Sequence, residues 1–371
     1  MVETGSLLRS CAGLYPYRGF ESLSLRHILL FYLMTIENII LYVLKHLPRS
    51  VIQFLAGKPE IIDGYQLDPN IQLVAKMAAQ KISKKRITVE DYRKDAMEFA
   101  RIAPKRFEEI KIKDEQINLG GSERKVRIYT PRKSNNCMPA VLSFHQGGLV
   151  LFNHLTNDYF CSLISRECNA KVISIDYRMC PEVNFPQPII DCLNLWNYVQ
   201  TNAKIFNIDP RRVALLGDSA GGLISLTLSA ELKNREVQPV AICVVYPWVT
   251  TSMDSQNSLE TCADVFPLDR KTVDFFRKTV FPNDLNIEHE WANPLFRDDL
   301  IDLPPMIIAT AGFDPIRDQG NQFAKKMKDN RNIVKHLFFK NLCHSFLLLG
   351  NVSKEVDKAN FKIANELRSL L

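Results

Sequence analysis

Residues 213–230 read VALLGDSAGGLISLTLSA, with a G-x-S-x-G pattern at residues 217–221. An apolar run precedes the pattern, and a stretch of helical character follows it. This context predicts a strand, a sharp turn and a helix that present the Ser219 hydroxyl at the carboxyl end of the strand. The flanking glycines allow a tight, strained backbone, and the helix N-terminus favours nearby negative charge. The pattern alone also fits an ordinary glycine-rich turn, so other residues must decide between the two.

A serine nucleophile needs three further groups. The hydroxyl is a poor nucleophile unless a base removes its proton, a carboxylate orients the base and N–H donors stabilise the oxyanion. A strand-like run at residues 140–144 leads into His145-Gln146-Gly147-Gly148. Glycines allow backbone amides to come close to a carbonyl oxygen. This turn is therefore the candidate for the oxyanion donors.

The carboxylate and the base are expected further along the chain. Asp314 follows a strand-like run at residues 305–311, and Asp318 is close enough to compete for the orienting role. Of the seven histidines, five fit the N-terminal segment, the glycine turn, a strand or a polar loop. His154 and His344 remain, and only His344 follows the last strand-like run. We therefore predict that His344 is the general base.

Five ordered motifs resemble those of the hormone-sensitive-lipase family of α/β-hydrolases, which includes bacterial carboxylesterases and arylacetamide deacetylases. The motifs are HQGG at 145–148, DYRMCPE at 176–182, GDSAGG at 217–222, DPIRD at 314–318 and HSF at 344–346. The order Ser, Asp, His is also that of an α/β-hydrolase triad. The resemblance covers roughly residues 60–371 and implies a mostly parallel eight-stranded sheet flanked by helices, with a helical cap from the N-terminal region.

The resemblance also implies roles for individual residues. Ser219 is the nucleophile, Asp314 orients the base and His344 is the base. The implied oxyanion donors are the amides of Gly147, Gly148 and Ala220, and the implied substrate-binding residues are Gln146 and Leu149. The substrate is expected to be a hydrophobic acyl ester of short to medium chain, or a lipid. This chemistry needs no metal and no organic cofactor.

Two positions depart from the family pattern. Gln146 replaces the first glycine of the His-Gly-Gly-Gly motif, and Ser345 replaces the glycine after the final histidine. If position 146 needs positive φ, a side chain there costs about 1–2 kcal/mol, and its amide can crowd the site. We expect altered acyl or alcohol selectivity.

Two other functions stay open. The plant gibberellin receptors resemble this family but bind a ligand without hydrolysing it. They have lost the triad histidine, whereas His344 is present here, so an active enzyme is favoured. Amide deacetylation uses the same groups as ester hydrolysis and is the second alternative.

Composition fits an ordinary folded enzyme. The chain has 371 residues, 46% of them hydrophobic and 24% charged, which suffices for one large α/β domain with a smaller attachment. Nine cysteines without C-x-x-C pairs indicate reduced thiols and a cytoplasmic protein. The net charge of +6 is spread along the chain without a nucleic-acid motif, so no nucleic-acid partner is expected. A homodimer is a further expectation.

The N-terminal segment carries an apolar run at residues 28–44. At 1.5 Å per residue the run spans about 25 Å as a helix, a little short for a bilayer core. A narrow polar stripe, with Glu37 mid-run, favours a helix in a membrane interface or docked on the enzyme. A true anchor is the third alternative. We predict peripheral membrane contact through residues 28–55.

The remaining organisation follows the hydrolase plan. Residues 1–58 are predicted to form a helical extension and residues 59–371 the hydrolase domain, with cap helices in 59–105 and the catalytic core in 106–371. Predicted helices cover residues 71–79, 89–102 and 266–280. Predicted strands cover residues 107–113, 125–129, 141–144, 172–175, 213–216, 241–245, 306–309 and 337–339. An ion pair is expected between Arg178 and Glu182.

Overall fold

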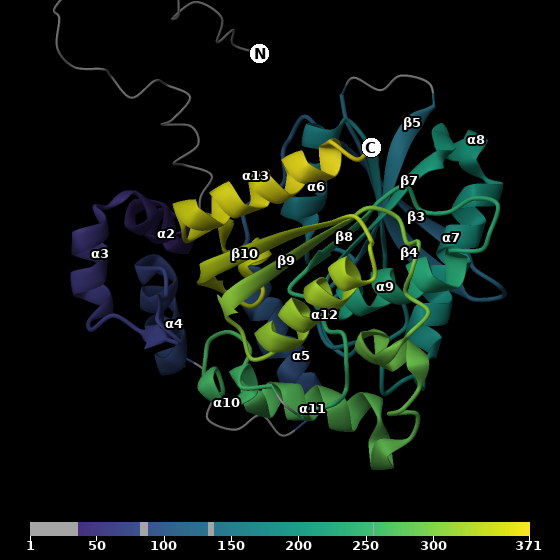
Figure 1. The fold of residues 1–371 in the computed structure, drawn as a ribbon. Coiled ribbons are helices and arrows are strands. Elements are labelled where there is room, and N and C mark those ends of the chain that lie inside the picture. Colours follow the sequence, from purple (N-terminus) through teal and green to yellow (C-terminus); the bar gives the residue numbers. More distant parts are fainter. Residues whose placement is uncertain (1–35, 82–87, 133–136, 255) are drawn as a thin grey trace, which may run out of the picture. The chain divides into compact units, whose positions relative to one another are not determined.

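The computed structural model describes residues 36–81, 88–132, 137–254 and 256–371 (Figure 1). The chain divides into two units, Met1–Ile40 and Leu41–Leu371. Helix α2 (Ile36–His46) begins in the first unit and ends in the second, which contains all the other described elements. Much of the predicted apolar run at residues 28–44 therefore lies outside the described residues. The predicted boundaries at residues 58 and 105 stay predictions.

An eight-stranded, mostly parallel sheet forms the centre of the second unit, as predicted (Figure 1). Its strand order is β10-β9-β8-β7-β5-β6-β4-β3. Strand β4 is antiparallel to both of its neighbours, and every other pair in this sheet is parallel. The strands are β3 (Lys111–Asn118), β4 (Glu123–Thr130), β5 (Met138–Phe144), β6 (Lys171–Ile175), β7 (Ile208–Asp218), β8 (Ile242–Val245), β9 (Met306–Phe313) and β10 (Val334–Cys343). A separate antiparallel pair consists of β1 (Ile61–Ile62) and β2 (Tyr65–Gln66).

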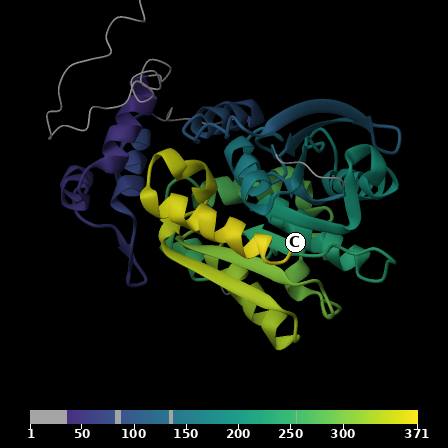
Figure 2. The same ribbon diagram turned by 90° about the horizontal axis from the view of Figure 1, so that it is seen from above.

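Helices cover both faces of the sheet (Figures 1 and 2). Side chains of α6 and α13 join the apolar core on one face, and those of α7, α9 and α12 join the cores on the other. The helices are α3 (Arg49–Ala56), α4 (Pro69–Lys81), α5 (Val89–Ala100), α6 (Asp158–Cys168), α7 (Gln187–Thr201), α8 (Ala203–Phe206), α9 (Ala220–Leu232), α10 (Ser258–Thr261), α11 (Arg270–Val280), α12 (Arg317–Asp329) and α13 (Lys354–Arg368). Four short 3-10 segments are Pro282–Asp284, Glu290–Ala292, Pro294–Phe296 and Phe346–Asn351. No described helix has both the length and the hydropathy that crossing a bilayer requires.

Strand β5 shows why the central strands have continuous apolar sequences. Val141 faces the core that contains α6 and α13, whereas Leu142 and Phe144 face the core that contains α7 and α9. Every residue of β5 is buried. A strand covered on both faces needs apolar residues at successive positions, which is the pattern that predicted this strand.

The first antiparallel strand starts later than predicted. The prediction at residues 107–113 overlaps only the beginning of β3. A turn with positive φ at Gly120 and Gly121 ends the β3–β4 hairpin and pairs Asn118 with Glu123. Because β3 is an edge strand with mostly polar, partly exposed residues, its sequence lacks the apolar signal of a buried strand.

The predicted ion pair between Arg178 and Glu182 is wrong. Arg178 donates to both carboxylate oxygens of Asp191, at 2.6 and 2.9 Å. The Asp191 side chain on α7 is fully buried and needs a cationic partner. Glu182 instead accepts a bidentate pair of bonds from Arg93 on α5, which also donates to the Val150 carbonyl in the loop after β5.

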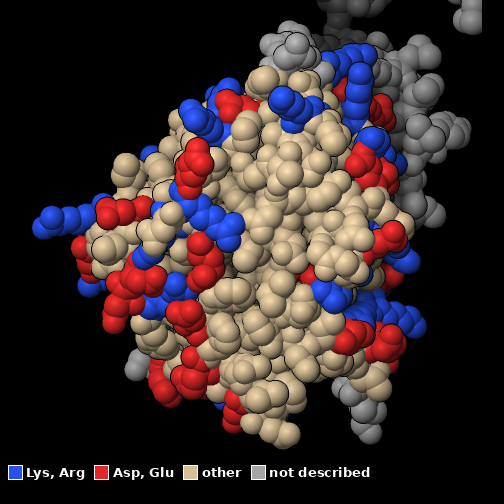
Figure 3. Space-filling model, turned by 90° about the vertical axis from the view of Figure 1, so that its right-hand side faces the viewer, with Lys and Arg blue, Asp and Glu red and all other residues tan. Residues whose placement is uncertain are grey.

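Charged side chains of both signs are interspersed on the molecular surface drawn in Figure 3. The chain carries 47 Lys and Arg residues and 41 Asp and Glu residues. On this face, blue and red side chains alternate around a largely uncharged centre. A nucleic acid binds through a continuous basic surface, and this face offers none.

His145 directly follows β5 and is buried, with 1% of its surface exposed. Its ring stacks on Tyr177 with ring centroids 4.2 Å apart, and its Nδ1 lies 2.7 Å from the Gln146 carbonyl oxygen. Its Nε2 has no hydrogen-bond partner among the described residues. Burial lowers the pKa of His145 to about 4. The residue therefore fixes the turn as a neutral imidazole.

This burial predicts a loss of stability in acid. The unfolded chain has a histidine pKa of about 6.5, so between that pH and pH 4 the unfolded state binds more protons than the folded state. The free energy of unfolding should then fall by about 3 kcal/mol as the pH drops through this window. Urea unfolding at a series of pH values should show a shallower dependence for His145→Gln. The exposed His46→Gln control should keep the wild-type dependence, and parallel curves for all three proteins would contradict the prediction.

Candidate active site

Ser219 lies between β7 and α9 in a strained backbone conformation. Its φ of 54° and ψ of −115° are rarely adopted by a residue with a side chain. Neighbouring backbone holds the turn: the Ser219 N–H donates to the Val245 carbonyl, and the Ser219 carbonyl accepts from the Trp248 N–H. Only 7% of Ser219 is exposed, and it lines a pocket. The predicted strand–turn–helix context of the serine is present.

The structure brings the predicted base and carboxylate to this serine. His344 Nε2 lies 3.0 Å from Ser219 Oγ, and His344 Nδ1 lies 2.7 Å from Asp314 Oδ2. His344 follows β10 and Asp314 follows β9, two parallel neighbours that end at the same edge of the sheet. The other oxygen of Asp314 accepts from the Ile316 N–H at 2.9 Å, which fixes the carboxylate. All three side chains are buried.

The alternative candidates lie in other environments. Asp318 accepts from the Ser258 N–H at 2.8 Å and from Arg317 Nε at 3.0 Å. His154 lies beside Asp176, with 3.3 Å between Nδ1 and the carboxylate. The geometry therefore favours Asp314 and His344 over these alternatives.

The glycine turn after β5 tolerates no side chain at its two glycines. Gly147 has a φ of 121°, and a Cβ there would lie 2.1 Å from the Leu151 carbonyl oxygen. Gly148 has a φ of 61°, and a Cβ there would lie 2.2 Å from the Phe276 ring of α11. Ala220 is the first residue of α9, where N–H groups have no partner within the helix. Gly148 and Ser219 line the same pocket.

The two departures from the family pattern contact each other. Gln146 is not among the residues with positive φ, so the expected backbone strain does not arise. Its side chain is 1% exposed, and its Oε1 accepts a hydrogen bond from Ser345 Oγ at 2.5 Å. Ser345 itself is left-handed, with a φ of 57° and a ψ of 22°, which explains why a glycine suits this position.

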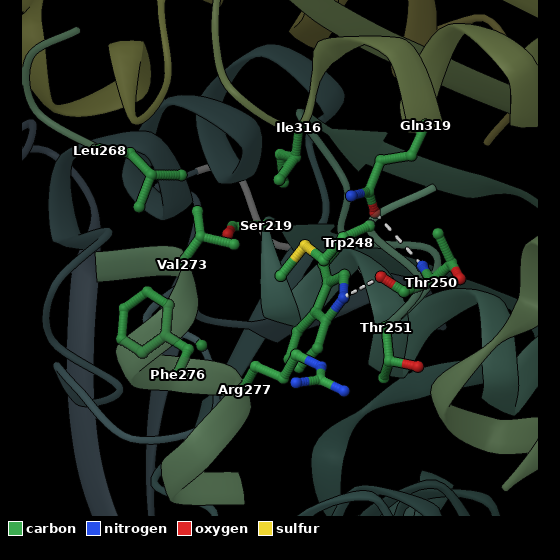
Figure 4. A pocket seen from close by; sticks show the side chains of 12 residues that line it. Ser219, Trp248, Thr250, Thr251, Leu268, Val273, Phe276, Arg277, Ile316 and Gln319 are labelled. Atoms are coloured by element: carbon green, nitrogen blue, oxygen red, sulfur yellow. Dashed lines mark hydrogen bonds between the residues drawn. The ribbon is translucent and has the colours of Figure 1, made fainter. Parts of the chain in front are cut away.

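A mostly apolar pocket opens beside Ser219 (Figure 4). Figure 4 shows Leu268, Val273 and Phe276 along one side, with Trp248 and Arg277 nearby. Neither Gln146 nor Leu149, the predicted substrate-binding residues, is among the residues that line it, and Leu149 is fully buried in the core. The lining residues are Gly148, Ser219, Trp248, Thr250, Thr251, Met253, Leu268, Val273, Phe276, Arg277, Ile316 and Gln319. Val273, Phe276 and Arg277 lie on α11, which falls within the helix predicted at residues 266–280, but none of these side chains was predicted to line the site.

A buried carboxylate supports the nucleophile turn from behind. Asp218, directly before Ser219, accepts from Asn157 Nδ2 at 2.7 Å and from the Tyr246 hydroxyl at 3.1 Å. Burial raises the pKa of Asp218 to about 7, and the two donors counteract part of that effect. The Tyr246 ring also lies beside His344, with centroids 4.7 Å apart. Neither donor was predicted from the sequence, although an acidic residue inside a buried motif indicates that such partners exist.

Known proteins share this sequence pattern. A family model described as alpha/beta hydrolase fold matches residues 141–348. The arylesterase of Saccharolobus solfataricus is 30% identical over 245 residues, which cover 66% of this chain and 79% of that protein. The carboxylic ester hydrolase LipN of Mycobacterium tuberculosis is 28% identical over 327 residues, which cover 85% of this chain and 86% of that protein.

Solved structures share the fold over nearly their whole length. An alpha/beta hydrolase enzyme from the metagenome of Lake Arreo superposes with a TM-score of 0.77 at 26% identity, covering 82% of this chain and 98% of that chain. A thermophilic carboxylesterase cloned from a metagenomic library gives a TM-score of 0.72 at 28% identity, covering 77% and 98%. With its five motifs in order on this sheet, the chain belongs to the hormone-sensitive-lipase family of alpha/beta-hydrolase-fold proteins and is an enzyme of the carboxylesterase type.

Proposed function

We propose that this enzyme hydrolyses hydrophobic carboxylic esters of short to medium acyl chain, with Ser219, His344 and Asp314 as its catalytic triad. One observation carries the proposal: an unbroken row of hydrogen-bonding contacts leads from Asp314 through His344 to Ser219, at 2.7 and 3.0 Å. The row ends in the wall of a largely apolar pocket. A base oriented by a carboxylate and in reach of a serine is the arrangement that activates the hydroxyl.

The reaction then proceeds in two halves. Ser219 Oγ attacks the ester carbonyl carbon while His344 Nε2 takes the hydroxyl proton, and Asp314 stabilises the imidazolium. The carbonyl oxygen becomes negatively charged and binds the amides of the glycine turn and of Ala220. The C–O bond to the alcohol breaks, and His344 gives its proton to the leaving oxygen. Water attacks the acyl-enzyme with His344 again as base, which releases the acid and restores Ser219.

The lining of the pocket beside Ser219 favours substrates with small acyl groups. Phe276 contacts the backbone at Gly148, so its ring limits the space next to Ser219. Larger acyl chains require this ring to move.

The alternatives differ in what supports them. Hydrolysis of an amide uses the same residues and differs in the leaving group, so deacetylation stays the second candidate activity. A receptor that only binds its ligand needs no base at the serine, whereas His344 Nε2 lies within hydrogen-bond distance of Ser219 Oγ. This contact favours catalysis over binding alone.

We expect Ser219→Ala to abolish hydrolysis of p-nitrophenyl acetate and labelling by a fluorophosphonate, because both require the nucleophilic oxygen. Ser225→Ala is the matched control, since Ser225 lies on α9 but donates its hydroxyl hydrogen to the Gly221 carbonyl. It should retain labelling and turnover. An unlabelled and inactive wild-type protein would refute the proposal and favour a ligand-binding protein.

The role of Phe276 gives a prediction about chain length. We expect Phe276→Ala to raise kcat/KM for p-nitrophenyl octanoate relative to acetate by about tenfold, because removing the ring enlarges the acyl space. Phe275→Ala is the control: its ring stacks on Tyr92 of α5 and does not line the pocket. An unchanged preference in Phe276→Ala would place the acyl group elsewhere.

The exposed face of α3 supports the proposed membrane contact. Ile52 and Ala56 are buried, whereas Val51, Phe54 and Leu55 are 40%, 82% and 43% exposed. A helix with one docked face and one exposed apolar face suits a peripheral position on a membrane surface.

We also propose a cytoplasmic location, because the eight described cysteines are all free. The homodimer stays a prediction.

Phe54→Glu should weaken binding of the full chain to vesicles of phosphatidylcholine and phosphatidylserine, because it puts a charge on the apolar face of α3. Vesicle flotation measures the bound fraction. Phe296→Glu changes an exposed phenylalanine, 60% accessible, in a different segment and should bind like the wild type. Equal flotation of all three proteins would rule out this contact.

A further inference from the structure

Two loops of the site are joined by a side-chain hydrogen bond. Gln146 directly precedes Gly147 in the turn after β5, and Ser345 directly follows His344 after β10. Ser345 Oγ donates to Gln146 Oε1 at 2.5 Å, although the two residues are 199 positions apart. Both side chains are buried, at 1% and 5% exposure. The bond therefore joins the residue before the proposed oxyanion donors Gly147 and Gly148 to the residue after the proposed base.

Stability alone does not explain this pair. Gln146 Nε2 is buried and has no hydrogen-bond partner among the described residues. An unpaired buried donor is unfavourable, and an apolar side chain of the same shape avoids that cost. Ser345 adopts a left-handed backbone that glycine adopts without steric conflict. An apolar residue at 146 together with glycine at 345 would therefore be more favourable for folding than this pair.

Backbone hydrogen bonds also tie each loop to a neighbouring segment. The His344 N–H donates to the Phe313 carbonyl, so the base is tied to β9. The Gly147 carbonyl accepts from the N–H groups of Val150 and Leu151, so the turn is tied to the residues that follow it. Neither of these two backbone bonds joins the turn to the loop that carries the base, whereas the bond between Ser345 and Gln146 does.

We propose that Gln146 and Ser345 are a coupled pair of positioning residues, whose hydrogen bond sets the spacing between the amides of Gly147 and Gly148 and the Nε2 of His344. This inference rests on the proposed function, in which the amides bind the carbonyl oxygen while His344 accepts the serine proton. Both groups must be in place around one reacting carbon, and a misplacement of about 1 Å can cost about a hundredfold in rate. Neither residue touches the reacting atoms in this proposal.

The test is a double-mutant cycle with Gln146→Met and Ser345→Ala, measured with p-nitrophenyl acetate. Each single variant should lower kcat by about 10- to 100-fold, with KM within about twofold of the wild type. The double variant should be no slower than the slower single variant, because the same bond is lost in each. Its midpoint of thermal unfolding should equal or exceed that of the wild type, since it lacks the unpaired Nε2 and the serine hydroxyl. The rate of fluorophosphonate labelling should fall in parallel with kcat.

Gln72→Met is the matched control, because Gln72 is a buried glutamine on α4 that donates to the Lys58 carbonyl at 2.7 Å, away from the pocket. It should keep the wild-type kcat. Unchanged kcat in both single variants, additive losses in the double variant, or a rise in KM at constant kcat would each overturn the inference. If the wild type neither turns over nor labels, the proposed function fails and this inference fails with it. If the wild type is active and the variants are equally active, the proposed role of Gln146 and Ser345 is wrong, while the proposed function stands.

Discussion

Parallel strand pairing is the constraint on which the site depends. Strands β5, β7, β8, β9 and β10 run in the same direction, so their carboxyl ends meet at one edge of the sheet. The chain leaves that edge at the glycine turn, at Ser219, at Asp314 and at His344. Ser219 and His344, 125 positions apart in the sequence, therefore lie with Oγ and Nε2 3.0 Å apart. The carboxyl edge of an open α/β sheet is where ligands bind in general.

The buried polar groups behind Ser219 lower the stability of the fold, but they hold the nucleophile turn in its conformation. Asp218 is buried beside a strained serine, and it is held by one amide and one phenol from other elements. His145 is likewise buried, and its Nε2 has no hydrogen-bond partner in the part of the chain that the structure describes. Such groups are unfavourable unless the surrounding structure holds them firmly. The apolar cores on both faces of the sheet supply that support.

The central strands and the nucleophile turn could be predicted from local sequence, because burial on both faces requires continuous apolar runs at β5, β7 and β9. Features that depend on contacts between residues far apart in the sequence could not be predicted in this way. The edge strand β3 is largely polar, and the partner of Arg178 is set by the burial of Asp191 and not by closeness in sequence. Trp248 and Phe276 line the pocket because separate segments fold over it, which no periodicity reveals. The bond between Gln146 and Ser345 joins positions that a motif comparison treats one at a time.

Phe276 and Gly148 are in contact but belong to segments with different tolerance of substitution. The glycine lies in the turn after β5, with a φ of 61°, and a Cβ there would lie 2.2 Å from the Phe276 ring. The phenylalanine belongs to α11, a helix outside the sheet, so a change of its side chain alters no strand residue. With the role proposed for Phe276, such enzymes would diversify their substrates through changes in one helix while the proposed triad stays constant. The same division offers a route for directed evolution, in which libraries confined to α11 explore new esters on an unchanged scaffold.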